Sequence, residues 1–291
     1  MGTLNKNILV IILFSLSCSV TAQMKYRLSK NDIERFELKG YVKSIFYREF
    51  QPSFKNRKKT KYILHPYTFL SEDNYRLNFK KNGYLKEKNN FTIENNQLKK
   101  FADWSYDYDN ENRVFKEICT FFDSNKELKW EYNYKKDTVE IVKFSNSEPN
   151  LFYRYVQENN TEIYTIRNSD NSYKEKTIFE YDNTNRLISI KKNYDRDAIQ
   201  EVIYTKYIDD HNARKESEIV EDIQQEKKHI SKFIYNEKGD ASNTFVIING
   251  KKNLFLTFEY IYDTNGNWIE RRTYNKDKKL VSVTKRGIEY Y

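Results

Sequence analysis

One short phrase recurs along this chain at a nearly constant spacing, and this repetition limits the folds that the chain can adopt. It reads FEYDNTNRLISI at residues 179–190, YDYDNENRVFKEI at residues 106–118 and YIYDTNGNWIERR at residues 260–272. A period of this kind indicates a repeat architecture rather than a single-copy globular enzyme domain. The residues that directly precede the turn recur every 27 positions at Tyr181, Ile208, Tyr235 and Tyr262, with looser copies at Phe79, Tyr108, Tyr134 and Tyr155.

Each copy of the phrase carries the chemistry of a tight turn. Asp or Asn usually follows the anchor, and Gly or Asn follows three places later, as in a type I turn that ends in a left-handed residue. Glycine enters the left-handed region freely and asparagine tolerates it next best, so D-x-x-G and D-x-x-N predict the same turn. The predicted turn residues are Asp109, Asn112, Asp182, Asn185, Asp209, Asn212, Asn236, Gly239, Asp263 and Gly266.

The runs between these turns predict β-strands, because they are rich in Tyr, Phe, Ile, Val and Thr. A second turn signal lies about halfway along each repeat, so a unit of about 27 residues is two antiparallel strands and two turns. Seven or eight units give roughly fourteen to sixteen strands, and open sheets beyond about ten strands curl or fold over. We therefore expect an all-β fold: an antiparallel β-meander repeat array that forms a curled or half-pipe sheet with aromatic side chains on its concave face.

The N-terminal part of the chain differs from the repeats. Residues 1–22 combine Lys6, an apolar run over residues 8–14 and small residues up to Ala22, which is the pattern of a secretory signal peptide. Residues 23–75 predict an N-terminal cap made of the first strands and a short helix over NDIERFEL, capped by Ser29 or Asn31. Residues 76–291 then form the repeat array.

This leader predicts an exported chain in the periplasm, on the cell surface or secreted. Its apolar run is too short to cross a bilayer, which takes about 20 residues, and the sequence predicts no later transmembrane segment. A lipid anchor at Cys18 is the weaker alternative, because Leu16 lies one place too late for a bacterial lipobox. Cleavage after Ala22 leaves Cys119 as the only cysteine, so we expect no disulfide within the chain.

The repeated phrase also resembles a known family. YDNTNRL at residues 181–187 is similar to the YD repeat of Rhs-like proteins, Y-D-x-x-G-R-L, with Asn in place of Gly. Residues 108–114 fit likewise, whereas residues 262–268 keep the glycine but replace R-L by Asn267 and Trp268. The layout resembles small exported YD-repeat proteins of Bacteroidetes-type bacteria. The resemblance implies curled β-sheet shells on secreted or cell-surface proteins, some of which encapsulate toxins while others are linked to carbohydrate binding or cell contact, and it supplies no catalytic residues.

No pattern of catalytic or metal-binding residues stands out in the sequence. His65, His211 and His229 lack catalytic or metal-ligand spacing, and DTNGN from residue 263 lacks the rest of a calcium loop. We therefore expect no enzyme activity, no metal and no cofactor. Two kinds of residue remain as candidates for binding a ligand.

The first candidates are Trp104 and Trp130, in a chain of which 16% is aromatic. A flat aromatic ring on a solvent-exposed strand face can stack on a sugar, although packing between strands accounts for aromatic residues at such positions equally well. The second is the basic run KNRKKTK, whose candidate residues are Lys55, Arg57, Lys58 and Lys59. It reads either as a solvated loop or as a patch for anionic envelope glycans or lipid headgroups.

The sequence thus predicts a noncatalytic exported binding or scaffold protein of the cell envelope, whose ligand is a glycan or a surface protein. Its formal net charge of +9 does not predict a nucleic-acid partner, because export separates the chain from nucleic acid. Two alternatives stay open: an enzyme that acts on envelope polysaccharides with carboxylates from several strands, and a partner or inhibitor of a secreted Rhs-type toxin.

Overall fold

The computed structural model describes residues 31–55, 58–64, 74–95, 97–193, 199–208, 214–223 and 225–291. In these residues, one antiparallel sheet accompanies a single four-residue helix. The elements are α3 (Asp32–Arg35), β1 (Val42–Lys55), β2 (Lys58–Leu64), β3 (Asn74–Phe79), β4 (Leu85–Glu94), β5 (Gln97–Tyr108), β6 (Val114–Phe121), β7 (Lys126–Lys135), β8 (Thr138–Ser145), β9 (Glu148–Glu158), β10 (Thr161–Asn168), β11 (Tyr173–Tyr181), β12 (Leu187–Asn193), β13 (Glu201–Tyr207), β14 (Lys215–Asp222), β15 (Lys227–Tyr235), β16 (Ala241–Ile248), β17 (Lys251–Tyr262), β18 (Trp268–Asn275) and β19 (Leu280–Tyr290).

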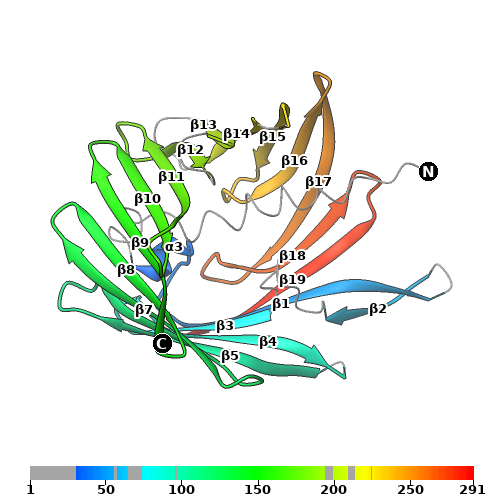
Figure 1. Ribbon diagram of the computed structural model, residues 1–291. Coiled ribbons are helices and arrows are strands. Elements are labelled where there is room, and N and C mark those ends of the chain that lie inside the picture. The colour runs from blue at the N-terminus through cyan, green and yellow to red at the C-terminus, as the bar shows by residue number, and fades with distance from the viewer. Residues whose placement is uncertain are drawn as a thin grey trace.

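The sheet closes on itself into a barrel (Figure 1). One edge of β1 pairs with β19, from Val42 opposite Tyr290 to Phe50 opposite Val283, and its other edge pairs with β3. In the described part of the chain, β1 and the seventeen strands from β3 to β19 therefore make a ring of 18 strands, while β2 pairs with the outer end of β1. The prediction of a curled or half-pipe sheet is wrong, because the two edges that an open meander would expose pair with each other. The predicted strand number was also too low.

Alternation along the strands gives the ring an inner and an outer wall. Ile45 and Leu77 pack with Ile33 and Phe36 of the N-terminal segment, and this face is the inner wall. Following the register from strand to strand places aromatic and apolar side chains on the same wall around the ring. Inner-wall residues that are buried include Phe79, Cys119, Val139, Ile141, Tyr155, Phe179, Ile203 and Val220. The hydrophobic core is therefore the lining of the barrel.

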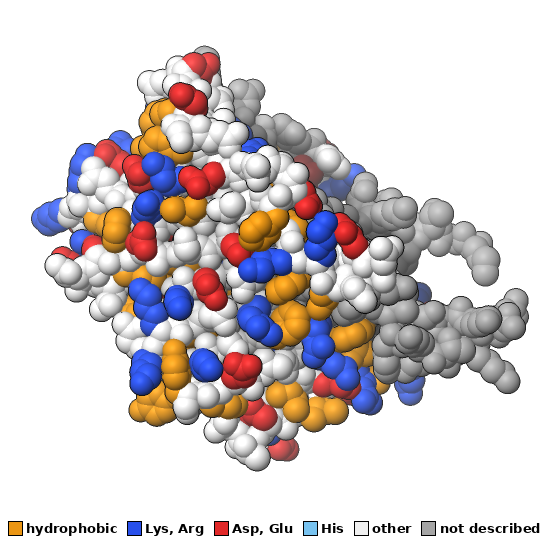
Figure 2. Space-filling view, turned by 90° about the horizontal axis from the view of Figure 1, so that it is seen from below, with side chains coloured by type: hydrophobic (Ala, Val, Ile, Leu, Met, Phe, Trp, Pro, Cys, Tyr) orange, Lys and Arg blue, Asp and Glu red, His pale blue; other side chains and the backbone are white. Residues whose placement is uncertain are grey.

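The outer wall carries charged side chains around the ring. Its ion pairs include Lys100–Asp103, Lys129–Glu131, Lys135–Glu140, Lys191–Glu180, Lys228–Glu221 and Lys285–Glu270, at 2.5 to 3.1 Å. Seen from below, the face formed by the lower strands of Figure 1 shows basic, acidic and hydrophobic side chains interspersed (Figure 2). Exposed pairs of this kind contribute only about 0–1 kcal/mol each to stability. They make the outer wall strongly polar.

The repeated phrase forms turns at one end of the barrel. We call the end made by residues 80–84, 109–113, 182–186, 236–240 and 263–267 the phrase rim. The left-handed residues there are Gly83, Asn112, Asn185, Gly239 and Gly266, with φ from 59° to 94°. Each turn is closed by the same backbone bonds, as where the Asn185 N–H donates to the Asp182 carbonyl at 3.0 Å. Asp209 and Asn212 lie outside the described residues.

The phrase also joins each unit to the next one. The Arg186 guanidinium lies 4.7 Å from the ring centre of Tyr207, and the Tyr207 hydroxyl donates to the Leu187 carbonyl at 2.9 Å. Tyr134 repeats both contacts with the unit before it, since it stacks on Arg113 at 4.5 Å and donates to the Val114 carbonyl at 2.8 Å. The arginine and the apolar residue of one unit therefore contact the tyrosine of the next unit, which explains why the chain repeats all three residues. Tyr207, rather than Ile208, takes the anchor position.

The short helix α3 lies against the phrase rim. Asn31 caps it, and the Asn31 and Glu34 side chains each accept a bond from the other's backbone N–H. The Asp32 carboxylate accepts hydrogen bonds from the Leu85 N–H at 2.7 Å and the Tyr108 hydroxyl at 3.2 Å. A helix this short is not stable alone. Its contacts with the rim hold it in place, and Ser29 lies outside the described residues.

Substitution of Asn185 tests the left-handed position of the turn. Because φ is 61°, we expect Asn185→Gly to keep the free energy of unfolding within about 0.5 kcal/mol, whereas Asn185→Val lowers it by about 1–2 kcal/mol. The control is Asn183→Val in the same turn, where the backbone is not left-handed. Chemical denaturation measures all three, and an equal loss in Asn183→Val would contradict the assignment.

The lowered pKa of Asp182 makes the stability of the same turn depend on pH. Burial alone would raise this pKa, but hydrogen bonds from the Arg186 and Thr184 backbone, the Thr184 hydroxyl and the Arg186 guanidinium lower it to about 2. An unfolded Asp has a pKa of about 3.9. The ionised Asp182 therefore contributes fully to the free energy of unfolding above pH ~4, and this contribution is lost as the pH falls towards 2.

Asp182→Asn keeps the turn bonds that Asn236 makes in its own copy, but it loses the ion pair with Arg186. We expect this variant to lose about 1 kcal/mol at neutral pH and to show a flatter fall in stability between pH 4 and 2. Urea unfolding across that range measures it, with exposed Asp277→Asn as the control. An unchanged pH slope in Asp182→Asn would count against this role of the carboxylate.

Candidate functional site

The structure brings the two candidate tryptophans together on the inner wall. Trp104 lies on β5 and Trp130 on β7, with Cys119 of the intervening β6 opposite Trp104. The ring centres of the two indoles are 5.2 Å apart at 23°, which is a stacked arrangement. Cys119 is fully buried, whereas both tryptophans are half-buried. Parts of both indoles therefore stay accessible.

A lysine completes this aromatic group. Lys143 on β8 lies opposite Trp130, with its ammonium nitrogen 5.1 Å from the ring centre. Burial lowers the pKa of Lys143, and the charges of Lys126 and Lys174 lower it further. Lys143 makes no ion pair or hydrogen bond with any residue that the structure describes. The group thus offers a stacked aromatic surface and one cation, and we call it the tryptophan pair site.

Two buried carboxylates of the inner wall are engaged by tyrosines. The Glu117 carboxylate accepts a hydrogen bond from the Tyr132 hydroxyl at 2.6 Å, and the Glu162 carboxylate accepts one from the Tyr181 hydroxyl at 2.9 Å. Burial, followed by the Glu162 charge, raises the pKa of Tyr181. These contacts connect neighbouring strands, so both carboxylates have a structural explanation.

The basic run lies at the outer end of the β1–β2 hairpin, which projects from the ring in Figure 1. The backbone of Lys55 pairs with Lys58, and that of Lys59 pairs with Phe54. Arg57 and the side chains of Lys55, Lys58 and Lys59 lie outside the described residues. Their proposed role in binding anionic ligands remains a prediction.

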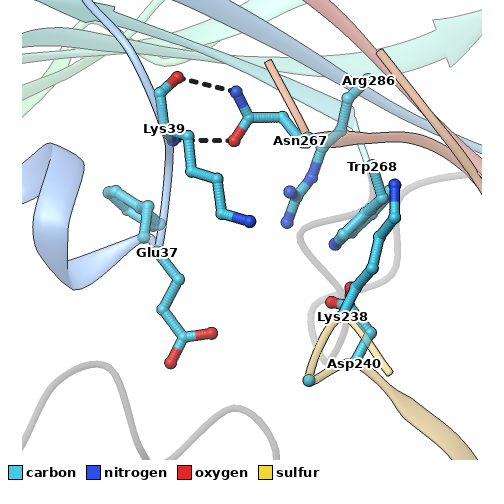
Figure 3. A pocket seen from close by; sticks show the side chains of 10 residues that line it. Glu37, Lys39, Lys238, Asp240, Asn267, Trp268 and Arg286 are labelled. Carbon is cyan, nitrogen blue, oxygen red and sulfur yellow. Dashed lines mark hydrogen bonds between the residues drawn. The ribbon is translucent and has the colours of Figure 1, made fainter. Parts of the chain in front are cut away.

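A pocket of about 150 Å³ opens at the phrase rim, and we call it the rim pocket (Figure 3). It is formed by four segments that are distant in sequence: the N-terminal segment, the turns after β15 and β17, and strand β19. The lining residues are Phe36, Glu37, Lys39, Lys238, Gly239, Asp240, Gly266, Asn267, Trp268 and Arg286.

Asn267 holds the N-terminal segment in the wall of this pocket. Its side chain accepts from the Lys39 N–H and donates to the Lys39 carbonyl, both at 2.8 Å, as the dashed lines in Figure 3 mark. Its amide also contacts the Tyr290 hydroxyl at 2.8 Å. The copies with Arg113 or Arg186 at this position use it to pair with the turn aspartate. Asparagine here binds a segment of backbone instead.

Arg286 and Trp268 form the inner side of the rim pocket. The guanidinium carbon lies 3.3 Å from the ring centre of Trp268, which is only 8% exposed. The Arg286 Nε atom is buried and has no hydrogen-bond partner among the described residues. The side chains of Lys39 and Arg286 both point towards the middle of the pocket in Figure 3. Two cations therefore converge on a small space.

Two acidic side chains, Glu37 and Asp240, line the same pocket. The Asp240 carboxylate accepts a hydrogen bond from the Tyr262 hydroxyl at 2.6 Å. Burial and then this hydrogen bond raise the pKa of Tyr262. With Lys238 added, three basic and two acidic side chains surround the pocket. Such a site can bind an anion and accept hydrogen bonds from hydroxyl groups.

The sequence reasoning missed the rim pocket, although one signal pointed to it. Residues 267–268 replace the usual R-L of the phrase by Asn and Trp, and these two departures provide the tie to Lys39 and the ring beneath Arg286. Lys39 and Arg286 carry no signal of their own, because they lie 247 residues apart in sequence.

No group of three or more His, Cys, Asp or Glu side chains in the described ranges is arranged to hold a metal ion. The same ranges contain no helix with the length and hydropathy to cross a membrane.

Comparison with known proteins gives only distant likenesses. No protein-family model and no curated protein matches the chain. Porin-like proteins from Bacteroides uniformis ATCC 8492 and Bacteroides vulgatus ATCC 8482 are each 10% identical, covering 86% and 87% of this chain and 98% and 99% of theirs, at TM-scores of 0.46 and 0.28. A TcdB2–TccC3–Cdc42 structure is 9% identical over 71% of this chain and 14% of that one, at a TM-score of 0.26. All three TM-scores lie below 0.5.

Proposed function

We propose that this chain is a noncatalytic binding protein of the cell envelope that works in water and holds a glycan on the inner wall of its barrel. The observation that carries the proposal is the stack of Trp104 on Trp130, which is partly exposed and lies next to Lys143. Indole rings combine a large apolar surface with a fixed geometry, and binding sites for small molecules are typically aromatic with a few polar groups.

The position of the stack supports binding as well as packing. Trp130 packs against the core cluster of Val139, Ile141 and Tyr155, yet both tryptophans keep part of their surface accessible next to Lys143. Lys143 is held near Trp130 without a carboxylate among its described neighbours, so its charge is left for a ligand oxygen. A surface protein is the other ligand that the sequence predicts, and the experiment below includes it as an outcome.

The outer wall supports a place in water. A membrane-spanning barrel carries an apolar outer band, and a Lys or Arg facing lipid at the bilayer midplane costs about 2–4 kcal/mol. Here Lys129–Glu131 lies mid-strand on β7, and Lys285–Glu270 joins the middle of β19 to β18. Together with the leader over residues 1–22, this favours the periplasm, the cell surface or the medium.

Flotation with phosphatidylcholine vesicles tests the hydrated outer wall. The chain from Gln23 onwards is expected to stay at the bottom of the gradient, because insertion would place these charge pairs in hydrocarbon. A control barrel that is known to insert in bilayers should float. Recovery of this chain with the vesicles after a carbonate wash would contradict the assignment.

A glycan array tests the proposed ligand. The purified chain from Gln23 is expected to bind defined glycans, and binding should persist at ~0.3 M salt, where exposed charges are strongly screened. The double variant Trp104→Ala, Trp130→Ala should lose at least roughly tenfold in affinity, because buried aromatic contacts dominate binding energy. Tyr204→Ala is the matched control, since Tyr204 is 42% exposed on a strand of the same barrel.

Two results would count against the glycan proposal. One is an equal loss of glycan affinity in Tyr204→Ala and in the double variant, when circular dichroism shows that both proteins are folded. The other is the absence of glycan binding while a purified envelope protein binds through the same tryptophans, which would replace the glycan by a protein ligand.

A further inference from the structure

We infer that the rim pocket is a second binding site and that it takes the carboxylate end of an acidic sugar, a hexuronate. The inference rests on the proposed function only in assuming a sugar ligand, since the pocket shares no lining residue with the tryptophan pair site.

The first support is an unsatisfied cation. Arg286 makes no ion pair or hydrogen bond within the described chain, and its Nε atom is shielded from solvent. A buried donor without a partner costs about 1–3 kcal/mol, and more when it is charged. The guanidinium fork fits a carboxylate better than any other side chain does. Lys39 points into the same space and adds a second positive charge.

The second support is the way in which Arg286 is fixed. Trp268 has the Arg286 guanidinium 3.3 Å and the Arg271 guanidinium 5.5 Å from its ring centre. Arg271 donates only a long bond of 3.4 Å to the Thr284 hydroxyl, and its Nε atom also lacks a partner in the described residues. Two arginines on one indole give a rigid basic surface. Binding to a rigid site costs less conformational entropy, because its side chains are already ordered before the ligand arrives.

The third support is the size and balance of the pocket. A volume of about 150 Å³ is enough for several water molecules, which suits one small polar unit. Glu37 and Asp240 accept hydrogen bonds and repel a multiply charged anion such as sulfate. A singly charged carboxylate can pair with Lys39 and Arg286, while neighbouring hydroxyl groups of the same ligand donate hydrogen bonds to Glu37 and Asp240.

The fourth support is the backbone at Glu37. Its φ is 54°, in the left-handed position directly after α3, where glycine is the usual residue. A side chain in this conformation costs of order 1 kcal/mol or more, and such strain tends to occur at binding sites. The C-terminal cap of α3, closed by the bond from the Leu38 N–H to the Ile33 carbonyl, holds the Glu37 backbone in this position on the edge of the pocket.

Calorimetric titration with D-glucuronate tests the inference, with D-glucose as the neutral counterpart and sulfate as the plain anion. D-glucuronate is expected to bind, D-glucose to show no measurable binding, and sulfate to bind more weakly because of Glu37 and Asp240. No heat with millimolar D-glucuronate would overturn the inference. Sulfate binding as tight as that of D-glucuronate would overturn the assignment to a sugar.

Substitutions locate the site. Arg286→Gln is expected to weaken D-glucuronate binding at least roughly tenfold, and Lys39→Gln by a few fold. Lys285→Gln is the matched control, because this neighbouring residue points to the outer wall and pairs with Glu270. If Arg286→Gln lowers the thermal unfolding midpoint, Lys39→Gln gives the independent answer, since Asn267 holds Lys39 through its backbone. Unchanged binding in Lys39→Gln, or equal loss in Lys285→Gln, would overturn the location.

The two proposed sites can fail separately. The double variant Trp104→Ala, Trp130→Ala should bind D-glucuronate as the unsubstituted chain does. Loss of D-glucuronate binding in that variant would overturn a second site. Retained D-glucuronate binding in a chain that binds no glycan on the array would count against the tryptophan pair site alone.

Discussion

The pairing of β1 with β19 is the constraint on which the rest of the structure depends. An antiparallel meander of this length has two exposed edges, and unpaired edges recruit other strands. Pairing residues 42–50 with residues 283–290 removes both edges of the ring and fixes which wall faces inward. Because one shift in register would turn every side chain to the other wall, the closing pair also determines where aromatic and charged residues lie.

The repeated phrase makes this closure attainable. Each copy supplies a turn, a cation that stacks on the tyrosine of the next unit and a carbonyl that accepts from its hydroxyl, as Arg186, Leu187 and Tyr207 show. These contacts are local, so most of the ring can form from neighbouring pairs before its ends meet. The copy at residues 262–268 departs from the pattern next to the closing strands. There Asn267 binds the N-terminal segment and Trp268 supports Arg286, so the rim pocket arises where the repeat meets the start of the chain.

The distribution of polarity connects this architecture to the proposed function. Apolar and aromatic residues line the inside of the barrel together with engaged polar groups such as Glu117 and Glu162, and many ion pairs lie around the outside. This distribution is the basis for the proposal that the barrel works in water and binds its ligand on the inner wall and at the phrase rim. The tryptophan pair site offers stacked rings with one lysine, whereas the rim pocket offers converging cations with two carboxylates. The two proposed sites therefore differ in the chemistry that they offer to a ligand.

The sequence by itself determined the local structure: strands rich in β-branched and aromatic residues, and turns that need Gly83 or Asn185 in a left-handed conformation. Strands and turns can be predicted from the sequence because interactions between residues close together in the chain produce them. Tertiary structure alone decided that the sheet closes, that Trp104 stacks on Trp130 across an intervening strand, and that Lys39 meets Arg286. Those outcomes depend on register and on contacts between residues far apart in the chain, for which a repeat period carries no information. The exchange of Arg-Leu for Asn267-Trp268 was visible in the sequence, but its meaning required the partner at Lys39.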